Sequence, residues 1–591
     1  MTRAIRIANC SGFYGDRVSA AREMVDGGPI DVLTGDYLAE LTMLILWKAR
    51  QKDASAGYAK TFLTQMEQVL GTCLDRGIRV VTNAGGLNPA GLADSLRQLA
   101  DKLGLAPRIA YVDGDNILGR VDELIAGGDT LAHLETGQAL SDAGVMPVSA
   151  NAYLGAWGIT EALAEEADIV VCPRVTDASL VVGPAAWWHR WSRTDYKALA
   201  GAVVAGHIIE CGPQATGGNY SWLDEVTDRR YPGFPIAEVE ADGSSVITKH
   251  ADTGGLVSPS TVTAQLLYEI DDPAYANPDV VAHFDTIRLE QVDTDRVRVS
   301  GIEGTAPPDQ LKVAVNYIGG YRNTMTLVLT GLDIDEKAAW AEQQLFDILG
   351  GKDRFSDVDV RLLRFDHEDA TKNEEATAHL RITVKDPDPR VVGRAFSNAT
   401  MELALASYSG FHTTTPPTSE SAYGVYWPTR LPAELIDHRV VLPDGACRTI
   451  PPAPTGHHGT LTPSPTRLPP APAGETRRAP LGRICAARSG DKGGNANIGV
   501  WTRTDVEYAW LREYLTVEKV RELLPEAADL EIRRYELANL YALNFVVVGL
   551  LGNGVAASTR PDPQAKGLGE YLRSRQVSIP VDLLAEPEEA V

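Results

Sequence analysis

Cysteine is scarce in this chain. Its six cysteines are scattered over 591 residues, and no two of them form a Cys-x-x-Cys pair. This distribution argues against a disulfide framework or a zinc knuckle and favours reduced thiols in a cytoplasmic protein. Long apolar runs are also missing, since the most apolar helix candidate, residues 41–47, is far shorter than the ~20 residues of a membrane span. The first residues lack the extended apolar segment of a signal peptide, so we expect no membrane partner.

Positive charge is outnumbered as well. The chain has 55 Lys and Arg residues against 79 Asp and Glu residues, a formal net charge of −24. A phosphate backbone would be repelled, so no nucleic-acid partner is expected. The acidic residues are spread along the sequence, which favours a solubility role for the excess charge. At this length, two or three domains are expected.

Strand-like and helix-like segments alternate over the first 180 residues. Apolar or β-branched runs lie at 4–9, 30–33, 78–82, 108–112, 145–149 and 168–172, with helical patterns between them. Such alternation predicts an α/β fold in which a Rossmann-like parallel sheet is covered on both faces. Ligands of such sheets bind beyond the carboxyl ends of the strands. Polar residues follow these predicted strands, namely Asn9, Asp16, Asp36, Asn83, Asp113, Asp115, Asn151, Arg174 and Asp177.

The loop after the third predicted strand has the features of an anion- or carbonyl-binding turn. Gly85 and Gly86 permit a tight turn, and Asn88 followed by Pro89 is typical of a helix start. The backbone N–H groups of such a turn would point into one crevice beside the Asn83 side chain. We therefore predict that Asn83, Gly85, Gly86 and Asn88 contribute to a binding site.

A second polar stretch combines glycine turns with titratable side chains. His207 and Glu210 are three residues apart, Cys211 follows, and Gly217 and Gly218 form a further turn. The spacing places His207 and Glu210 on one helical face. Two such ligands make an incomplete metal site, so no metal is predicted, and a packed structural role for His207 stays open.

The segments of the chain differ in predicted secondary structure and composition, and these differences suggest domain boundaries. We predict an α/β parallel-sheet domain over 1–278, a central α+β subdomain over 279–450, a proline-rich linker over 451–480, and a ferredoxin-like α+β domain over 481–591. In the last domain, a glycine-rich turn over 489–499 carries Asp491 and Lys492. It could bind a carboxylate or phosphate, or it could be a tight turn closed by an Asp–Lys pair.

Several motifs resemble the acyclic terpene utilisation family AtuA over residues 4–450. They are Asn9-Cys-Ser-Gly-Phe-Tyr-Gly-Asp16, Gly35-Asp-Tyr-Leu-Ala-Glu40, Thr82-Asn-Ala-Gly-Gly-Leu-Asn-Pro89, Pro173-Arg-Val-Thr-Asp-Ala-Ser179, Gly206-His-Ile-Ile-Glu-Cys-Gly212 and Thr216-Gly-Gly218. The Ser489-Gly-Asp-Lys-Gly-Gly494 segment resembles the ferredoxin-fold domain that often follows this family. The resemblance implies a role in the bacterial breakdown of citronellol and geraniol through acyl-CoA intermediates.

On this basis we expect an enzyme that acts on a branched acyl-CoA or carboxylate by hydratase, lyase or hydrolase chemistry. Coenzyme A would enter as part of the substrate, the cofactor stays unknown, and a homo-oligomer is expected. Asp36, Glu40 and Asp177 are the acid/base candidates, because burial raises a carboxyl pKa toward neutrality. Asn83 and the two glycine amides would hold the thioester oxygen, with His207 and Cys211 as a reserve base and nucleophile. The residues expected to bind substrate are Gly12, Gly85, Gly86, Asn88, Arg174, Gly217, Gly218, Asp491, Lys492 and Arg560.

Two other readings stay open. Asp36 follows the second predicted strand, where a nicotinamide enzyme places its ribose-binding acid, but the Gly-x-Gly-x-x-Gly spacing is missing. The chain could also be a non-catalytic subunit that binds a metabolite, with its last domain serving assembly.

Overall fold

The computed structural model of this protein describes residues 3–455, 461 and 466–584. The chain divides into two compact units. The first contains Met1–Asn316, Tyr426–Val555 and Gln564–Val591, and the second contains Tyr317–Val425 and Ala556–Pro563. The chain leaves the first unit within strand β14 (Gln310–Thr330) and returns to it within β18 (Ser421–Pro432).

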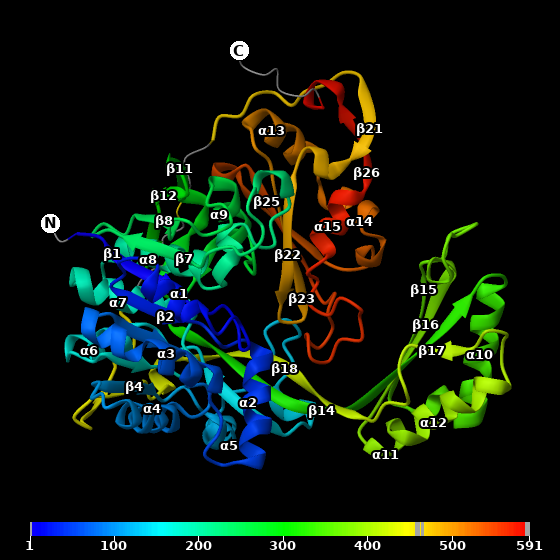
Figure 1. The fold of residues 1–591 in the computed structure, drawn as a ribbon, viewed down its shortest axis with the longest axis horizontal. Helices are drawn as coiled ribbons and strands as arrows, with labels where there is room; N and C mark the ends of the chain where they lie inside the picture. Colours follow the sequence, from blue (N-terminus) through cyan, green and yellow to red (C-terminus); the bar gives the residue numbers. More distant parts are fainter. Residues whose placement is uncertain (1–2, 456–460, 462–465, 585–591) are drawn as a thin grey trace. The chain divides into compact units, whose positions relative to one another are not determined.

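A large mixed sheet organises the first unit (Figure 1), and the predicted α/β class is confirmed. Its middle strands are parallel and run in the order β1 (Ile5–Asn9), β2 (Val32–Gly35), β3 (Arg79–Thr82), β6 (Ile169–Val171) and β4 (Ile109–Asp113). Antiparallel strands extend both ends: β7 (Pro235–Val239), β8 (Ser245–Lys249), β12 (Arg296–Ser300) and β11 (Arg288–Asp293) beside β1, and β19 (Arg439–Val441) and β20 (Cys447–Thr449) beside β4.

One predicted strand lies outside this sheet. Residues 145–149 were expected to join the parallel strands, but β5 (Pro147–Ala152) pairs with β14 instead. The Asn316 amide donates to the Ser149 hydroxyl of β5, and the N–H of Tyr153, directly after β5, donates to the Lys312 carbonyl. The pairing therefore brings Lys312 beside the predicted strand-end residues.

Helices pack against the parallel strands. The apolar sides of α1 (Ala20–Asp26), α3 (Lys60–Arg76) and α4 (Pro89–Leu103) form one core with β1, β2, β3, β4 and β6. Helices α6 (Trp157–Ala164), α7 (Ser179–His189) and α8 (Tyr196–Ile209) pack on one another and on β4, β1 and β7 respectively. The shorter or peripheral helices are α2 (Glu40–Lys52), α5 (Val121–Ala126) and α9 (Pro259–Leu266).

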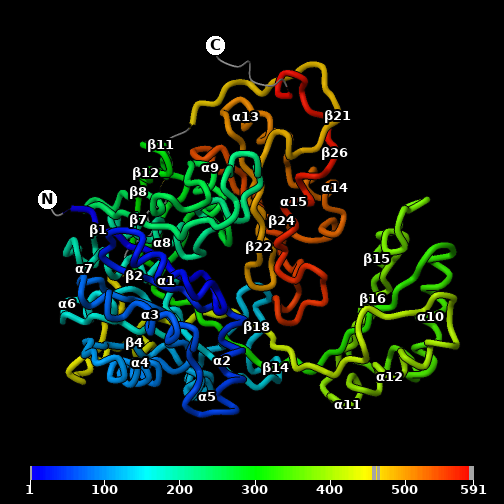
Figure 2. Tube along the Cα trace, viewed as in Figure 1, coloured from blue at the N-terminus to red at the C-terminus, as the bar shows by residue number. Residues whose placement is uncertain are grey.

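The second unit is an antiparallel sheet with helices packed against it (Figures 1 and 2). Its strands run in the order β15 (Asp357–Arg364), β16 (Thr377–Asp386), β14 and β17 (His412–Thr413). Helices α10 (Ile334–Leu349) and α12 (Arg394–Glu402), with the short α11 (Pro389–Val392), complete it. Met325, Leu345 and Phe396 are fully buried in its core.

The C-terminal segment of the first unit has a four-stranded antiparallel sheet in the order β22 (Ala486–Lys492), β23 (Asn495–Trp501), β25 (Ala542–Val547) and β24 (Ile532–Leu537). Helices α13 (Asp505–Tyr514), α14 (Val517–Leu523) and α15 (Leu568–Ser574) accompany it. The predicted turn over 489–499 is wrong in extent, because β22 and β23 pair from Ala486–Trp501 to Lys492–Asn495 and leave only Gly493 and Gly494 between them. Residues 456–460 and 462–465 of the predicted linker lie outside the described residues, and β21 (Thr476–Pro480) pairs with β26 (Gln576–Pro580).

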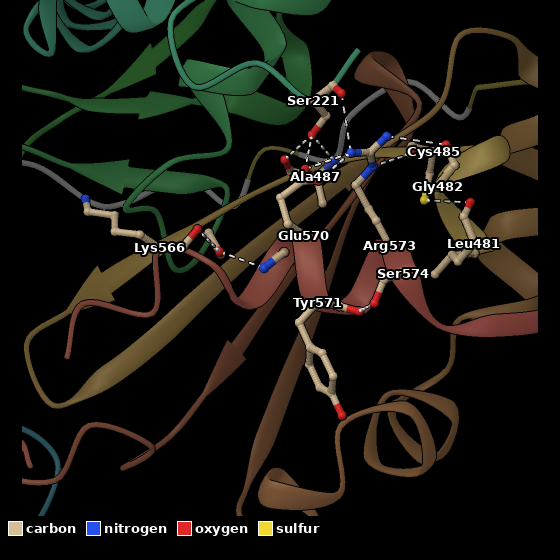
Figure 3. Close-up of polar contacts among 12 residues, drawn as sticks. Ser221, Leu481, Gly482, Cys485, Ala487, Lys566, Glu570, Tyr571, Arg573 and Ser574 are labelled. Atoms are coloured by element: carbon tan, nitrogen blue, oxygen red, sulfur yellow. Dashed lines mark hydrogen bonds and ion pairs between the residues drawn. The ribbon is translucent and has the colours of Figure 1, made fainter. Parts of the chain in front are cut away.

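This C-terminal segment is docked on the α/β core within the first unit (Figure 3). The Ser221 hydroxyl lies 2.8 Å from the Ala487 carbonyl oxygen and 2.9 Å from the Glu570 carboxylate, and these two acceptors share its one proton. Arg573 donates to that same carboxylate and to the Cys485 carbonyl. Among the described residues, no helix is both long and apolar enough to cross a bilayer.

Candidate active site

A cavity of about 800 Å³ lies within the first unit. Part of its wall comes from loops after β1, β2 and β6, part from the 210–219 and 268–278 segments and the start of β14, and part from β22 and the residues before α15. The α/β core and the C-terminal segment therefore share one cavity. Nine predicted site residues line it, namely Gly12, Asp36, Glu40, Arg174, Asp177, Cys211, Gly218, Asp491 and Lys492.

Asp36 is a buried carboxyl held by Asn83. The Asn83 amide donates to Asp36 Oδ1 at 2.6 Å, and its oxygen accepts the Tyr37 N–H at 2.8 Å. Burial, together with the nearby Asp177 carboxylate, raises the pKa of Asp36 well above its ordinary value, and the Arg174 charge and the Asn83 hydrogen bond oppose this. The site therefore favours the protonated form of Asp36. Asn83 is fully buried behind it and acts by positioning Asp36.

The rest of the 82–89 loop is directed elsewhere. The Gly85 N–H donates to the Cys172 carbonyl and the Gly86 N–H donates to the Asn83 carbonyl, so neither amide is available to a thioester oxygen. Asn88 caps α4 by accepting the Gly91 N–H at 3.0 Å. The N–H groups of Gly85 and Gly86 are thus bonded to backbone carbonyls, which opposes their expected role in holding the thioester oxygen.

Glu40 differs from Asp36 in its electrostatics. Tyr153 donates its hydroxyl to Glu40 at 2.8 Å, and Lys312 Nζ lies 3.5 Å from the same oxygen. Burial opposes ionisation, but the Lys312 and Arg174 charges outweigh it and lower the pKa of Glu40 to about 2. Glu40 is thus an anion beside Lys312, which opposes the acid half of its expected acid/base role.

The buried Arg174 and the partly exposed Asp177 form an ion pair in the loop after β6. Arg174 Nη1 donates to Asp177 Oδ1 at 2.7 Å and to the Leu38 carbonyl at 3.1 Å, and its guanidinium stacks on Tyr153 at 4.2 Å. The Arg174 backbone N–H donates to Asp115, a buried carboxyl that also accepts from Asn151 at 2.6 Å. Arg174 is therefore occupied in building the site, and one face of Asp177 remains toward the cavity.

Glu210 faces the cavity, whereas His207 lies behind it. Asn9 donates to the Ile209 and Glu210 carbonyls and fixes this turn. Burial raises the pKa of Glu210 well above its usual range, and Asp177 and Glu269 add to the effect. His207 Nδ1 is 3.1 Å from Glu210 Oε1, but burial lowers the pKa of His207 to about 4, so the imidazole is neutral. His207 packs between the rings of Tyr275 and Phe284, which favours the packed structural role that the sequence left open for it.

Cys211 lines the cavity as a thiol. Burial raises its pKa well above the ordinary value, and the Glu210 carboxyl adds to this, which opposes its reserve role as a nucleophile. Its backbone also explains Gly12: a Cβ at Gly12 would lie 2.7 Å from the Cys211 carbonyl carbon. The first loop and the Glu210 turn therefore meet at a point where only glycine fits.

The C-terminal segment contributes cations and a carboxyl. Lys492 Nζ donates to the Glu269 carbonyl at 2.6 Å, and burial and the Lys312 charge lower its pKa. Asp491 accepts from Gln564, and burial raises its pKa to about 7, with Glu269 adding to the rise. Arg488 stacks on Tyr268 at 4.4 Å and donates to Gln214. The predicted Asp–Lys pair is thus replaced by separate partners for each residue.

Two further predicted residues, Gly217 and Arg560, are not among the residues that line the cavity. Gly217 ends a 3-10 turn with φ at 99°, while its neighbour Gly218 is at the wall. Arg560 belongs to the second unit. Among the described residues, no group of three or more His, Cys, Asp or Glu side chains is arranged to hold a metal ion.

Three important wall residues are missing from the predicted set: Glu210, Glu269 and Lys312. Glu210 lies in the same Gly206–Gly212 motif as His207, so its position in that motif was a signal in the sequence. Lys312 and Glu269 lie in segments with no local signal, because their places depend on β14 pairing and on the C-terminal docking.

Comparison with known families gives two matches in order along the chain. The model of "Acyclic terpene utilisation family protein AtuA" matches residues 5–442, and that of "AtuA ferredoxin-like domain" matches residues 479–578. Comparisons with curated proteins and with solved structures found no match.

Proposed function

The chain belongs to the acyclic terpene utilisation family AtuA, and we propose that it is an enzyme acting on an acyl-CoA or carboxylate substrate in acyclic terpene or related branched-acid catabolism. The observation that carries this proposal is the content of one cavity. It gathers two carboxyls whose protonated forms are favoured by burial, Asp36 and Glu210, with the amino groups of Lys312 and Lys492.

The two lysines suit an anionic or polarised carbonyl group. Lys312 comes from β14 and Lys492 from β22, and each side chain also lies near a tyrosine ring. The Lys312 charge lowers the pKa of Lys492, so the two charges repel each other, and an anion bound near both would relieve that repulsion. A substrate carboxylate or thioester oxygen held there would be polarised as negative charge develops on it.

The carboxyls suit the proton transfer. Hydration, elimination and hydrolysis each require a proton to be taken up or released beside the activated carbonyl or the attacking water. Burial raises the pKa values of Asp36 and Glu210 well above the ordinary range and favours their protonated forms, which suits them to proton transfer. In this proposal the two carboxyls share one proton: the protonated carboxyl gives it and the ionised one accepts it, while Asp177 orders Arg174 at the edge of the cavity.

The test is turnover of branched acyl-CoAs and free branched acids by the purified chain and by Asp36→Asn, Glu210→Gln and Asp177→Asn. We expect losses of about a hundredfold or more in kcat for the first two variants. Asp101→Asn, which changes an exposed carboxylate on α4, is the matched control. Wild-type turnover retained in both Asp36→Asn and Glu210→Gln would refute the assignment.

Binding of an acyl-CoA without turnover would instead support the non-catalytic alternative. The nicotinamide alternative gains no support from the loop after β1. Its Gly12 is pressed against the Cys211 backbone, and the Gly12 N–H donates to Asp16 at 2.8 Å, so this N–H is not available to a pyrophosphate. Fluorescence titration with NADH checks this directly.

A further inference from the structure

Residues 267–271, which follow α9, cross the face of the C-terminal four-stranded sheet at very close range. A Cβ at Gly490 of β22 would lie 2.3 Å from the Tyr268 ring, and one at Gly499 of β23 would lie 2.3 Å from Leu267 Cβ. The two strands thus carry glycine at the points where this segment crosses them. A larger residue at either place would push the segment off the sheet.

Side chains of the same sheet hold the segment by its backbone. Asn497 accepts the Glu269 N–H at 2.8 Å, and Lys492 donates to the Glu269 carbonyl at 2.6 Å. Asn544 donates to the Asp271 carbonyl at 2.8 Å and accepts from Asn497. Both asparagines are fully buried. The sheet therefore satisfies both backbone polar groups of Glu269.

Glu269 has a left-handed backbone, with φ at 58°. For a residue that is not glycine this conformation costs about 1 kcal/mol or more, and it persists where the surroundings impose it. The conformation places Glu269 on the cavity wall beside Lys492 and Asp491. Its carboxylate also acts on Glu210 and Asp491, whose protonated forms it favours.

We propose that Glu269 is a catalytic carboxylate of this cavity and that the C-terminal ferredoxin-like domain sets its position. In this view the domain completes the active site of its own chain, so turnover requires it to be docked on residues 267–271. The inference rests on the proposed function for its catalytic half, whereas the positioning of Glu269 can be tested without any substrate.

A matched pair of asparagines separates positioning from docking. Asn497 grips Glu269, while Asn539 of the same domain donates to the Phe284 and Ile287 carbonyls at 2.9 Å each, away from the cavity wall. Hydrogen–deuterium exchange is measured on peptides that cover 267–271. We expect faster exchange there in Asn497→Ala and wild-type exchange in Asn539→Ala. Equal exchange in both variants and the wild type would overturn the positioning.

The catalytic half is tested with the branched acyl-CoA or acid that the wild type converts. Glu269→Gln is expected to lower kcat at least about tenfold with little change in KM, and Asn497→Ala to lower kcat well below that of Asn539→Ala. Glu269→Gly relieves the left-handed strain, so it should lose turnover while its melting midpoint stays at or above that of the wild type.

Wild-type kcat in Glu269→Gln, alongside an inactive Glu210→Gln, would overturn the role of Glu269 and leave the proposed function standing. Equal loss of kcat in Asn497→Ala and Asn539→Ala would overturn the role of the C-terminal domain in positioning Glu269 for catalysis, and the proposed function would still stand. A wild type that converts no acyl-CoA or acid would refute the proposed function and the catalytic half together, and the exchange experiment would still decide the positioning.

Discussion

Asp115 offers a test of the site's electrostatics that needs no substrate. Its side chain is 2% exposed at the end of β4, and burial raises its pKa to about 7, against the hydrogen bonds from Asn151 and the Arg174 N–H. The folded chain therefore keeps a proton on Asp115 between about pH 4 and pH 7, where the unfolded chain has released it. The free energy of unfolding must fall as pH rises through that window.

The size of the effect follows from the shift. The pKa moves from 3.8 to about 7, and each unit corresponds to about 1.4 kcal/mol, which gives about 4 kcal/mol. With an unfolding entropy of about 2 cal/mol/K per residue, this is a change of about 3 °C in the melting temperature of the 591-residue chain. Asp115→Asn is neutral at every pH and keeps a carbonyl oxygen for the same donors, so it should lose this contribution.

Differential scanning calorimetry of the wild type, Asp115→Asn and the exposed control Asp101→Asn checks the expectation. The melting temperature of Asp115→Asn relative to the wild type should rise by about 3 °C between about pH 4 and pH 8, while the control difference stays flat. A difference between Asp115→Asn and the wild type that does not change with pH would show that Asp115 is ionised in the folded chain and would refute the reasoning.

Further expectations concern single residues of the cavity. Iodoacetamide near neutral pH should label the exposed Cys447 first and leave Cys211 largely unmodified, because burial raises the pKa of the Cys211 thiol. Peptide mass spectrometry measures the labelling of each cysteine, and rapid labelling of Cys211 would contradict the expectation. Gly12→Ala should lower the melting temperature, since its Cβ meets the Cys211 backbone at 2.7 Å, whereas Gly119→Ala, whose Cβ has no neighbour within 4 Å, should leave it near the wild-type value. Asn83→Ala should move the pH profile of kcat/KM by about 1 unit or more toward higher pH through Asp36, because a hydrogen bond to a charged acceptor is worth about 1.5–3 kcal/mol; an unmoved profile would remove Asp36 as the titrating group. Glu40→Gln should raise KM and leave the shape of the pH profile unchanged, because Glu40 is ionised down to about pH 2 and serves to hold Lys312; a displaced acidic limb would contradict this.

Local patterns in the sequence were sufficient for the parallel strands and for the family. The β-branched runs of β1, β2, β3, β4 and β6 are buried on both faces, which makes them readable without long-range information. Polar residues at their carboxyl ends, such as Asp36 and Asp177, follow from the same topology. The helix start at Asn88 was also readable, although it caps α4 and binds nothing in the cavity.

Only the tertiary structure decided the chemistry of the site. Asp36 and Glu40 stand in one short motif, yet the pKa of Asp36 rises through burial and the pKa of Glu40 falls because Lys312 arrives from β14. Likewise, Glu269 reaches the wall because a distant sheet grips its backbone. The pKa of a carboxyl depends on its burial and on charges that long-range pairing brings near it, and the local sequence determines neither.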